Sequence, residues 1–248
     1  MRYFVQFSYD GSAYHGWQRQ PSDVSVQQIM EESFSTLLGR SVELVGAGRT
    51  DAGVHAREMF AHFDVAGCDT DDLVYRLNAF LPKDVAIKDI FQVGETAHAR
   101  FDALERTYEY WVVQEKNPFL FDFAHYVRHP LDIEKMNEAA HILLEHTDFE
   151  CFSKSRTDVK TFLCDIRRAQ WEKKPDKWVF TIVADRFLRN MVRAVVGTLL
   201  EVGLGKNPPH FVNDVIKSGN RSMAGPSVPA KGLYLTKVLY PKTIMLHG

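Results

Sequence analysis

Hydrophobic and polar positions in the first part of the chain follow two different periods. Alternation or short apolar runs predict four strands, at residues 2–10, 41–48, 58–65 and 84–93. Apolar residues at helical spacing predict helices over 25–39 and 69–81. Gly39 is a stop signal for the first helix, and Asp69 or Thr70 is a cap for the second. The order is strand, helix, strand, strand, helix, strand.

The second part of the chain repeats this order. Strands are predicted at residues 106–114, 167–173, 178–185 and 232–240, with a turn at 174–177. Helices are predicted over 131–145 and 186–203. Two split strand-helix-strand halves of ferredoxin-like type predict an α+β protein. We expect the halves to join into one antiparallel sheet, with helices on one face and a central cleft on the other.

The boundary between these halves is predicted near residue 103. Residues 1–103 form the N-terminal half and residues 104–248 the C-terminal half, and no Pro/Gly/Ser-rich connector separates them. The chain has no apolar run of about 18 residues and no signal peptide, so we expect a soluble, cytoplasmic protein. Cys68, Cys151 and Cys164 lie far apart, and reduced, mostly buried thiols are expected.

The net charge of −2 gives little information about partners. A nearly neutral chain still binds nucleic acid if its arginines are gathered on one surface. The distribution of arginine therefore matters more than its total.

The stretch "GAGRTDAG" at 46–53 is the first candidate for chemistry. It lacks the third glycine of a dinucleotide fingerprint and the lysine of a phosphate loop. Gly46 and Gly48 suggest a bend or close approach at a strand end, and Arg49 and Asp51 would point to the same side of an extended backbone. Asp51 in isolation is more often a turn or cap residue, but a carboxylate beside a guanidinium stays ionised and suits a nucleophile or proton acceptor.

Three arginines give the second signal. Helical spacing puts Arg186, Arg189 and Arg193 on one face of the predicted helix 186–203. The opposite face carries Leu188, Met191, Val192, Val195 and Leu199. Small residues at Ala194 and Gly197 would let a bulky partner come close. A solvated charged face is the plain alternative, whereas arginines without a matching acid favour phosphate contacts or a pair with a distant carboxylate.

Aromatic residues add candidates for base contacts. Tyr108 and Tyr110 share one side of a predicted strand, either as core residues or as a platform for a base. Trp17 is expected to pack in the core, while Arg19 and Gln20 would suit RNA backbone contacts. The histidines His15, His55, His62 and His98 show no metal-ligand spacing, so no metal site is predicted.

Four segments are distinctive when taken together: "YHGWQRQP", "GAGRTDAGVHA", "FLRNMVRAVVGTLLEVG" and "GLYL". With these segments in this order, the chain resembles the bacterial tRNA pseudouridine synthase A (TruA) family from end to end. The resemblance implies an isomerase that converts uridine to pseudouridine at positions 38, 39 and 40 of the tRNA anticodon arm. It also implies a homodimer with no metal or organic cofactor. Gln28 and Ala194 depart from the common pattern, which leaves the choice of uridine open.

The resemblance also assigns roles to individual residues. It implies that Asp51 is the catalytic carboxylate and that Arg49 helps to extrude the target nucleotide. By the same resemblance, Tyr108 stacks on the extruded uracil and Arg193 pairs with Asp51. Leu233 would line the pocket, which leaves Arg186 and Arg189 for phosphates.

Two functions of other classes remain open from the residues alone. One is an RNA-binding module without catalysis, for which replacing Asp51 would leave RNA affinity intact. The other is a small-molecule enzyme that uses "GAG" at a cofactor and ignores RNA. Within the predicted class, a synthase with broader RNA targets is a further alternative.

Overall fold

The computed structural model describes residues 1–154 and 160–245 of the chain. Within these residues there are five α-helices and nine strands, which confirms the α+β class. The chain forms two compact units, which we call the first and the second unit. The first contains Met1–Glu105 and the chain from Leu235 onward, and the second contains Arg106–Tyr234.

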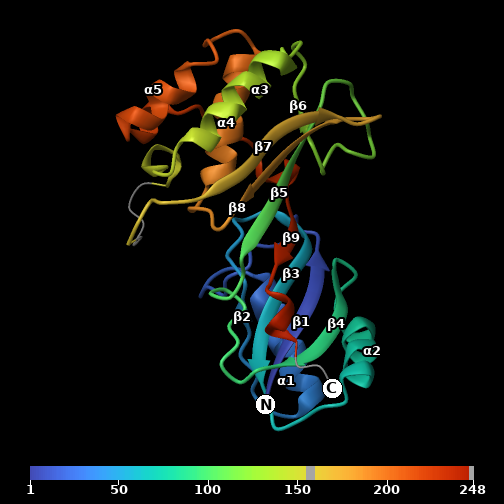
Figure 1. The fold of residues 1–248 in the computed structure, drawn as a ribbon. Helices are drawn as coiled ribbons and strands as arrows, with labels where there is room; N and C mark the ends of the chain where they lie inside the picture. Colours follow the sequence, from blue (N-terminus) through green and yellow to red (C-terminus); the bar gives the residue numbers. More distant parts are fainter. Residues whose placement is uncertain (155–159, 246–248) are drawn as a thin grey trace. The chain divides into compact units, whose positions relative to one another are not determined.

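Three antiparallel strands in the order β4-β1-β3 form most of the sheet of the first unit (Figure 1), and β9 (Leu233–Leu239) is the next strand after β3. The three strands are β1 (Arg2–Tyr9), β3 (His55–Asp64) and β4 (Val85–Val93), and the short β2 (Val45–Gly46) pairs with β3. The two helices of this unit are α1 (Val26–Leu38) and α2 (Thr70–Phe80). They pack on each other, and α2 also packs on β4.

Local signals in the sequence account for both helix ends of α1 and for the start of α2. The Ser25 hydroxyl caps α1 by accepting from the Gln28 N–H, and Gly39 ends it at φ 65°. The Asp69 carboxylate caps α2 by accepting from the Asp72 N–H. The Asp69 cap and the glycine stop confirm the predictions made for these helices, whereas the Ser25 cap had not been predicted.

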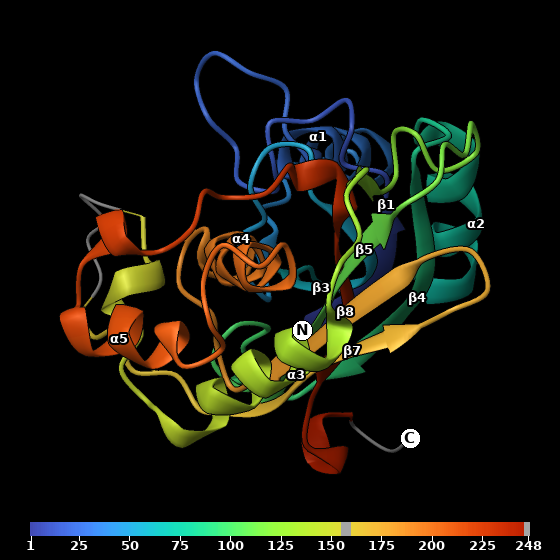
Figure 2. The same cartoon turned by 90° about the horizontal axis from the view of Figure 1, so that it is seen from above.

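The second unit has the strand order β5-β8-β7, again antiparallel. Its strands are β5 (Glu105–Val113), β6 (His125–Tyr126), β7 (Ile166–Lys173) and β8 (Trp178–Ala184). The first residue of β5, Glu105, still belongs to the first unit. Its helices are α3 (Ile133–Ile142), α4 (Met191–Gly203) and α5 (Phe211–Ser218). The helix α3 packs on β7, α4 and α5 (Figure 2). The pair β5–β6 is parallel, so the strands are mostly rather than wholly antiparallel.

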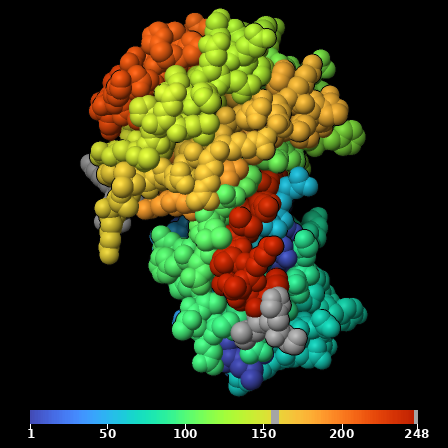
Figure 3. Space-filling model, in the orientation of Figure 1, coloured from blue at the N-terminus to red at the C-terminus, as the bar shows by residue number. Residues whose placement is uncertain are grey.

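The chain passes between the units twice. It leaves the first unit at the start of β5 and returns within β9 (Leu233–Leu239). On its return, β9 is fixed to β3 by the Glu58 carboxylate, which accepts from the Val238 N–H at 2.9 Å. Figure 3 shows the segment near residue 100 beside this C-terminal strand, where the Leu104 N–H donates to the Leu239 carbonyl at 2.8 Å.

Three elements differ from the prediction. The strand predicted at 41–48 is only Val45–Gly46, because two earlier donors go elsewhere: the Val42 N–H to the Ser35 hydroxyl and the Leu44 N–H to the Glu31 carboxylate. The helix predicted from residue 186 begins only at Met191. The helix α5 had not been predicted at all.

The cysteines follow the prediction. Cys151 and Cys164 are buried, and none of the three cysteines is in a disulfide. Burial raises the pKa of each of these two thiols to about 12. Among the described residues, no helix has both the length and the apolar content needed to span a bilayer.

Candidate active site

Asp51 lies in the loop between β2 and β3, which we call the Asp51 loop (residues 47–54). Thr50 points into the unit, where its hydroxyl lies 2.8 Å from the hydroxyl of Tyr9. Arg49 is exposed and Asp51 half-buried on either side of it. The burial pattern therefore agrees with the prediction that Arg49 and Asp51 point to the same side, although this stretch is a loop.

A second segment, residues 11–17, supports this loop through close backbone contact. The Trp17 N–H donates to the Thr50 carbonyl at 3.3 Å, and the Gly53 N–H donates to the Tyr14 carbonyl at 3.2 Å. Gly16 has φ 83°, and a Cβ added there would lie 2.3 Å from the Thr50 carbonyl oxygen. Because only glycine fits this contact, the position of Asp51 depends on Gly16.

The first glycine of "GAG" has a structural role, whereas a Cβ added at Gly48 would meet nothing within 4 Å. A Cβ at Gly46 would lie 2.6 Å from the Trp17 ring, so this glycine makes room for an indole of the same chain. Trp17 is buried, as predicted. The space beside Gly46 is therefore filled by protein, which weighs against the alternative that "GAG" cradles a cofactor.

The remaining predicted residues of the first unit are anchored by side-chain bonds. The Nε of Arg49 donates to the Gln18 side chain at 3.1 Å, a positioning contact that the sequence did not reveal. Arg19 pairs with Glu31 at 3.2 Å and with Glu32 at 3.6 Å. Gln20 donates to the His15 carbonyl at 3.0 Å. Arg19 and Gln20 thus also stabilise their own segment.

The three arginines of the second unit do not share a helix face, contrary to the prediction. Arg186 and Arg189 lie in the loop between β8 and α4, and only Arg193 is helical. The break falls at Asn190, which has φ 66° and donates to the Ser227 hydroxyl at 2.6 Å. The Asp185 carboxylate holds the start of this loop by accepting from the Arg186 N–H at 2.7 Å.

Helix α4 is buried nearly all round, which differs from the expected half-charged helix. Arg193 exchanges two hydrogen bonds with Val228: its Nε donates to the Val228 carbonyl at 2.8 Å, and the Val228 N–H donates to the Arg193 carbonyl at 3.2 Å. A Cβ at Gly197 would lie 1.8 Å from the Pro226 carbonyl oxygen. The small residue predicted to admit a partner therefore admits residues 225–228 of the same chain.

Aromatic residues flank this arginine-bearing loop. The ring of Tyr108 meets that of Phe187 edge-on, with centroids 5.2 Å apart, and Phe187 is a neighbour that the sequence analysis missed. Tyr110 is fully buried and donates to the Pro229 carbonyl at 2.9 Å. The two tyrosines therefore differ, with Tyr110 in the core and Tyr108 half-buried. Leu233 is buried at the start of β9.

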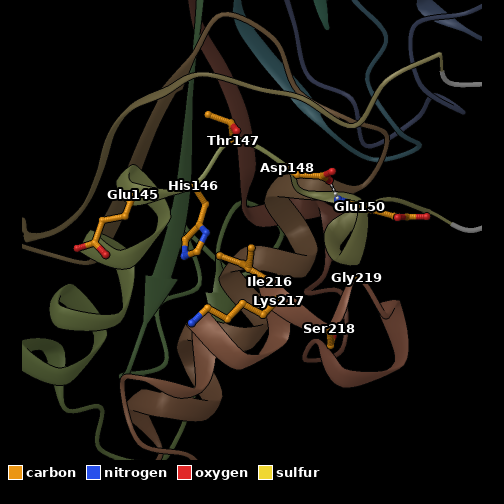
Figure 4. Close-up of a pocket in the computed structure, with 9 residues that line it drawn as sticks. All are labelled: Glu145, His146, Thr147, Asp148, Glu150, Ile216, Lys217, Ser218 and Gly219. Carbon is orange, nitrogen blue, oxygen red and sulfur yellow. Dashed lines mark hydrogen bonds between the residues drawn. The ribbon is translucent and has the colours of Figure 1, made fainter.

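A separate pocket of the second unit lies between residues 145–150 and the end of α5, and Figure 4 shows its lining. Glu145, Asp148 and Glu150 give it three carboxylates, against the single ammonium of Lys217. None of the predicted site residues lines this pocket. Its acidic character would repel RNA phosphates, so we do not assign it to the candidate site.

The candidate residues of the two units carry different chemical groups. The first unit presents a carboxylate and a guanidinium on the Asp51 loop, and the second presents arginines, a half-buried tyrosine and an apolar strand start. Among the residues that the structure describes, no group of three or more His, Cys, Asp or Glu side chains could hold a metal ion. The predicted pair of Asp51 with Arg193 would join these two sets of residues and stays a prediction.

Comparison with known proteins identifies a family to which the chain is similar. The model of the tRNA pseudouridine synthase family matches residues 6–102 and 139–241. These ranges contain Asp51 and Arg193, whereas Tyr108 lies between the two ranges and outside both.

Relatives match over nearly the whole chain. The tRNA pseudouridine synthase A of Bacteroides fragilis is 49% identical over 246 residues, covering 98% of both chains. The protein of the same name from Bacteroides thetaiotaomicron is 51% identical, over 98% of this chain and 92% of its own. That of Porphyromonas gingivalis is 50% identical over 99% of each chain.

Proposed function

The chain belongs to the tRNA pseudouridine synthase family, and we propose on that premise that it isomerises uridine to pseudouridine in tRNA. The observation that carries the proposal is the identity of about half to synthases of this name along nearly the whole chain. The resemblance noted from the sequence specifies positions 38, 39 and 40 of the anticodon arm as targets. A cytoplasmic homodimer that needs no cofactor completes the proposal.

The reaction needs few chemical groups. The bond between N1 of uracil and C1′ of ribose breaks, the uracil rotates, and C5 bonds to C1′ while the C5 proton is lost and N1 gains one. In the proposal, Asp51 is the catalytic carboxylate, which attacks C1′ or C6 or removes the C2′ proton. Its loop suits this role, because the contacts of Gly16 and Thr50 fix the backbone while the carboxylate stays half-exposed.

The target uridine must first leave the base stack. Extrusion costs a few kcal/mol, which new stacking and phosphate contacts offset. We assign Arg49 to extrusion and Tyr108 to stacking on the uracil, since Tyr108 is half-buried and held edge-on by Phe187. Leu233 would line the pocket.

Arginines supply the remaining contacts. Arg193 is assigned as the ion-pair partner of Asp51, with its Nε already bonded to Val228 so that its orientation is set. Arg186, Arg189, Arg19 and Gln20 would contact the RNA backbone. Their positions on loops at the surface of each unit are compatible with this role.

Tritium release tests the proposal directly. An unmodified tRNA transcript labelled at C5 of uridine is incubated with native protein, with Asp51→Asn and with Asp89→Asn, an exposed acid on β4 of the same unit. We expect release by the native protein and the Asp89 variant and at least a 1,000-fold lower rate for the Asp51 variant, an order-of-magnitude figure for losing an essential catalytic group. Mapping of modified positions then tests the assignment to 38, 39 and 40.

The same experiment separates the alternatives. Binding of tRNA without any tritium release by the native protein would leave an RNA-binding module. Equal release by native and Asp51→Asn protein would remove Asp51 from the mechanism while keeping the reaction.

A further inference from the structure

We propose that Gln27, in the first turn of α1, is a positioning residue for the reaction. It holds the side chain of Gln18, and through Gln18 it sets the direction of the Arg49 guanidinium. This inference rests on the proposed function, since it assumes that Arg49 helps to extrude the target uridine. The contact between Arg49 and Gln18 described above is thus the last link of a longer network that begins at α1.

The amide of Gln27 makes four hydrogen bonds. Its Oε1 accepts from Nε2 of Gln18 at 2.7 Å and from the Arg19 N–H at 2.9 Å. Its Nε2 donates to the Glu31 carboxylate and to the Leu44 carbonyl, both at 2.9 Å. A glutamine side chain has two N–H donors and a carbonyl oxygen with two lone pairs, so every site of this amide is used. A flipped amide would turn its oxygen toward two acceptors, and the four bonds therefore fix its orientation.

The network is anchored on Glu31, an acid of the same helix that is only 8% exposed. The Glu31 carboxylate accepts from the Leu44 N–H at 3.1 Å as well as from Gln27, and the Arg19 guanidinium lies 3.2 Å from it. Gln27 and Glu31 stand four positions apart, which places them on one face of α1. Because a network in a buried setting is rigid when its members are satisfied, Gln27 has a fixed base.

The main chain of α1 holds the segment that carries Gln18. The Val26 N–H donates to the Gly16 carbonyl at 3.2 Å. The Gln27 N–H donates to the Trp17 carbonyl at 3.0 Å. These donors belong to the first turn, where a helix offers them no partner of its own. The backbone before Gln18 is therefore fixed without the Gln27 side chain, and replacing that side chain should release the side chain of Gln18 rather than its backbone.

Arg49 and Gln18 gain order from this network rather than from burial, because both are exposed. Long side chains at a surface occupy many rotamers, and ordering one of them on binding costs entropy. Gln18 donates to Gln27 through Nε2 and accepts from Nε of Arg49 through Oε1, at 3.1 Å. The guanidinium is planar, so a bond at Nε also directs its two terminal nitrogens. The network thus orients Arg49 before the RNA binds.

A double-mutant cycle tests the assignment. Single-turnover tritium release from the unmodified tRNA transcript is measured for Gln27→Met in the native protein and in Arg49→Ala. In the native protein we expect a rate about tenfold lower, with tRNA affinity changed less than about threefold, because methionine keeps the length of the side chain but cannot replace the four bonds. In Arg49→Ala the same substitution should lower the rate less than about twofold further, since the side chain that Gln27 positions is gone.

Two more variants complete the experiment. Gln18→Met removes only the exposed link and should reproduce the loss of about tenfold. It decides the question if the urea midpoint shows that Gln27→Met does not fold. Gln28→Met is the matched control in the same turn of α1, where the Gln28 amide donates to the exposed Glu32 at 3.0 Å. Its rate should change less than about twofold.

Three outcomes would contradict the inference. A native rate in folded Gln27→Met, or in Gln18→Met where the other variant does not fold, would show that the network positions nothing. Equal losses with and without Arg49 would assign Gln27 to stability alone. Native activity of Arg49→Ala would leave the network without a side chain to position. Tritium release by the native protein, measured alongside, reports separately on the proposed function, so failure of the inference and failure of the reaction are distinguishable.

Discussion

The Asp51 loop and the segment 185–193 carry the charged candidates of the two units, and they are fixed in different ways. The Asp51 loop is irregular, and its position comes from backbone contact with residues 11–17. The segment 185–193 crosses from a loop into a helix, and Arg193 is fixed by its exchange of hydrogen bonds with Val228. Both regions are held by a segment distant in sequence, the first through close backbone contact at Gly16 and the second through hydrogen bonds to Val228.

This difference explains which residues could be assigned from sequence. In the Asp51 loop, Arg49 and Asp51 stand two residues apart in one short motif, so the motif alone indicated the candidates, although their support from residues 11–17 is distant in sequence. In the second region, helical spacing grouped Arg186 and Arg189 with Arg193, and the structure separates them at Asn190. Periodicity is therefore a poor guide where a tertiary contact decides where a helix begins.

The largest expected effect concerns the fixed arginine. Arg193→Lys should lower kcat/KM about 100-fold or more, because lysine cannot bond the Val228 carbonyl through Nε while also directing a second donor at a carboxylate. Arg189→Lys in the loop should lower it less than about threefold. Tritium release at low tRNA concentration measures both. Equal effects of the two substitutions would remove the distinction between helix and loop arginines.

The next effect tests the glycine support of the Asp51 loop. Gly16→Ala should destabilise the protein by roughly 3 kcal/mol or more, through the left-handed backbone and the clash with the Thr50 carbonyl. Gly39→Ala is the matched control, since Gly39 has φ 65° but nothing within 4 Å of an added Cβ, and about 1 kcal/mol is expected. Urea unfolding gives both values. Similar losses would show that the close contact adds nothing beyond backbone strain.

Acid should affect the first unit through His62. Burial and the nearby Arg2 lower the pKa of His62 from its ordinary value of 6.5 to about 4. As the pH falls below 6.5, His62 is protonated in the unfolded chain before it is protonated in the folded protein. The contribution of neutral His62 to the free energy of unfolding is therefore full above about pH 6.5 and is lost progressively toward pH 4. The loss should reach roughly 2–3 kcal/mol.

Urea midpoints at pH 7, 5.5 and 4.5 measure this loss, with His62→Asn as the comparison. Asparagine can still accept from the Ala99 N–H but does not titrate. An unchanged pH dependence in the variant would show that another group is responsible.

The smallest effect concerns the loop arginines. The double variant Arg186→Gln/Arg189→Gln should weaken tRNA binding about fivefold to tenfold at physiological salt and reduce the salt slope by about 1–2. Arg167→Gln/Arg168→Gln on β7 removes the same charge from the same unit and should change binding less than about twofold. Equal losses would mean that the charge of the unit, rather than the loop, attracts the RNA.

Most elements of the fold were predictable because their signals are local. The caps Ser25 and Asp69 and the stop at Gly39 lie within a few residues of the helix ends that they set. The exceptions depend on distant groups, as where Glu31 takes the Leu44 N–H away from a strand ladder. The helix α5 had signals too, with Val212, Val215 and Ile216 at helical spacing before Gly219, but it is only eight residues long.

The candidate site was predictable in its side chains but not in its support. Nothing in the sequence indicates that Gly16 touches Thr50, that Gln18 holds Arg49, or that Phe187 meets Tyr108. These contacts join segments whose pairing only the folded chain creates. The predicted division into two functional halves at residues 103 and 104 stays a prediction. The compact units of the structure differ from these halves, because the chain from Leu235 onward belongs to the first unit.

The return of β9 to the first unit has a consequence for synthesis on the ribosome. The Tyr240 ring packs edge-on against Phe4 and Phe60, with centroids 5.3 and 5.2 Å away. Phe4 and Phe60 leave the exit tunnel long before Tyr240 does. The first unit therefore cannot complete its core until Tyr240 has been synthesised, so a nascent chain that stops before it leaves these phenylalanines without their partner and open to chaperones and proteases.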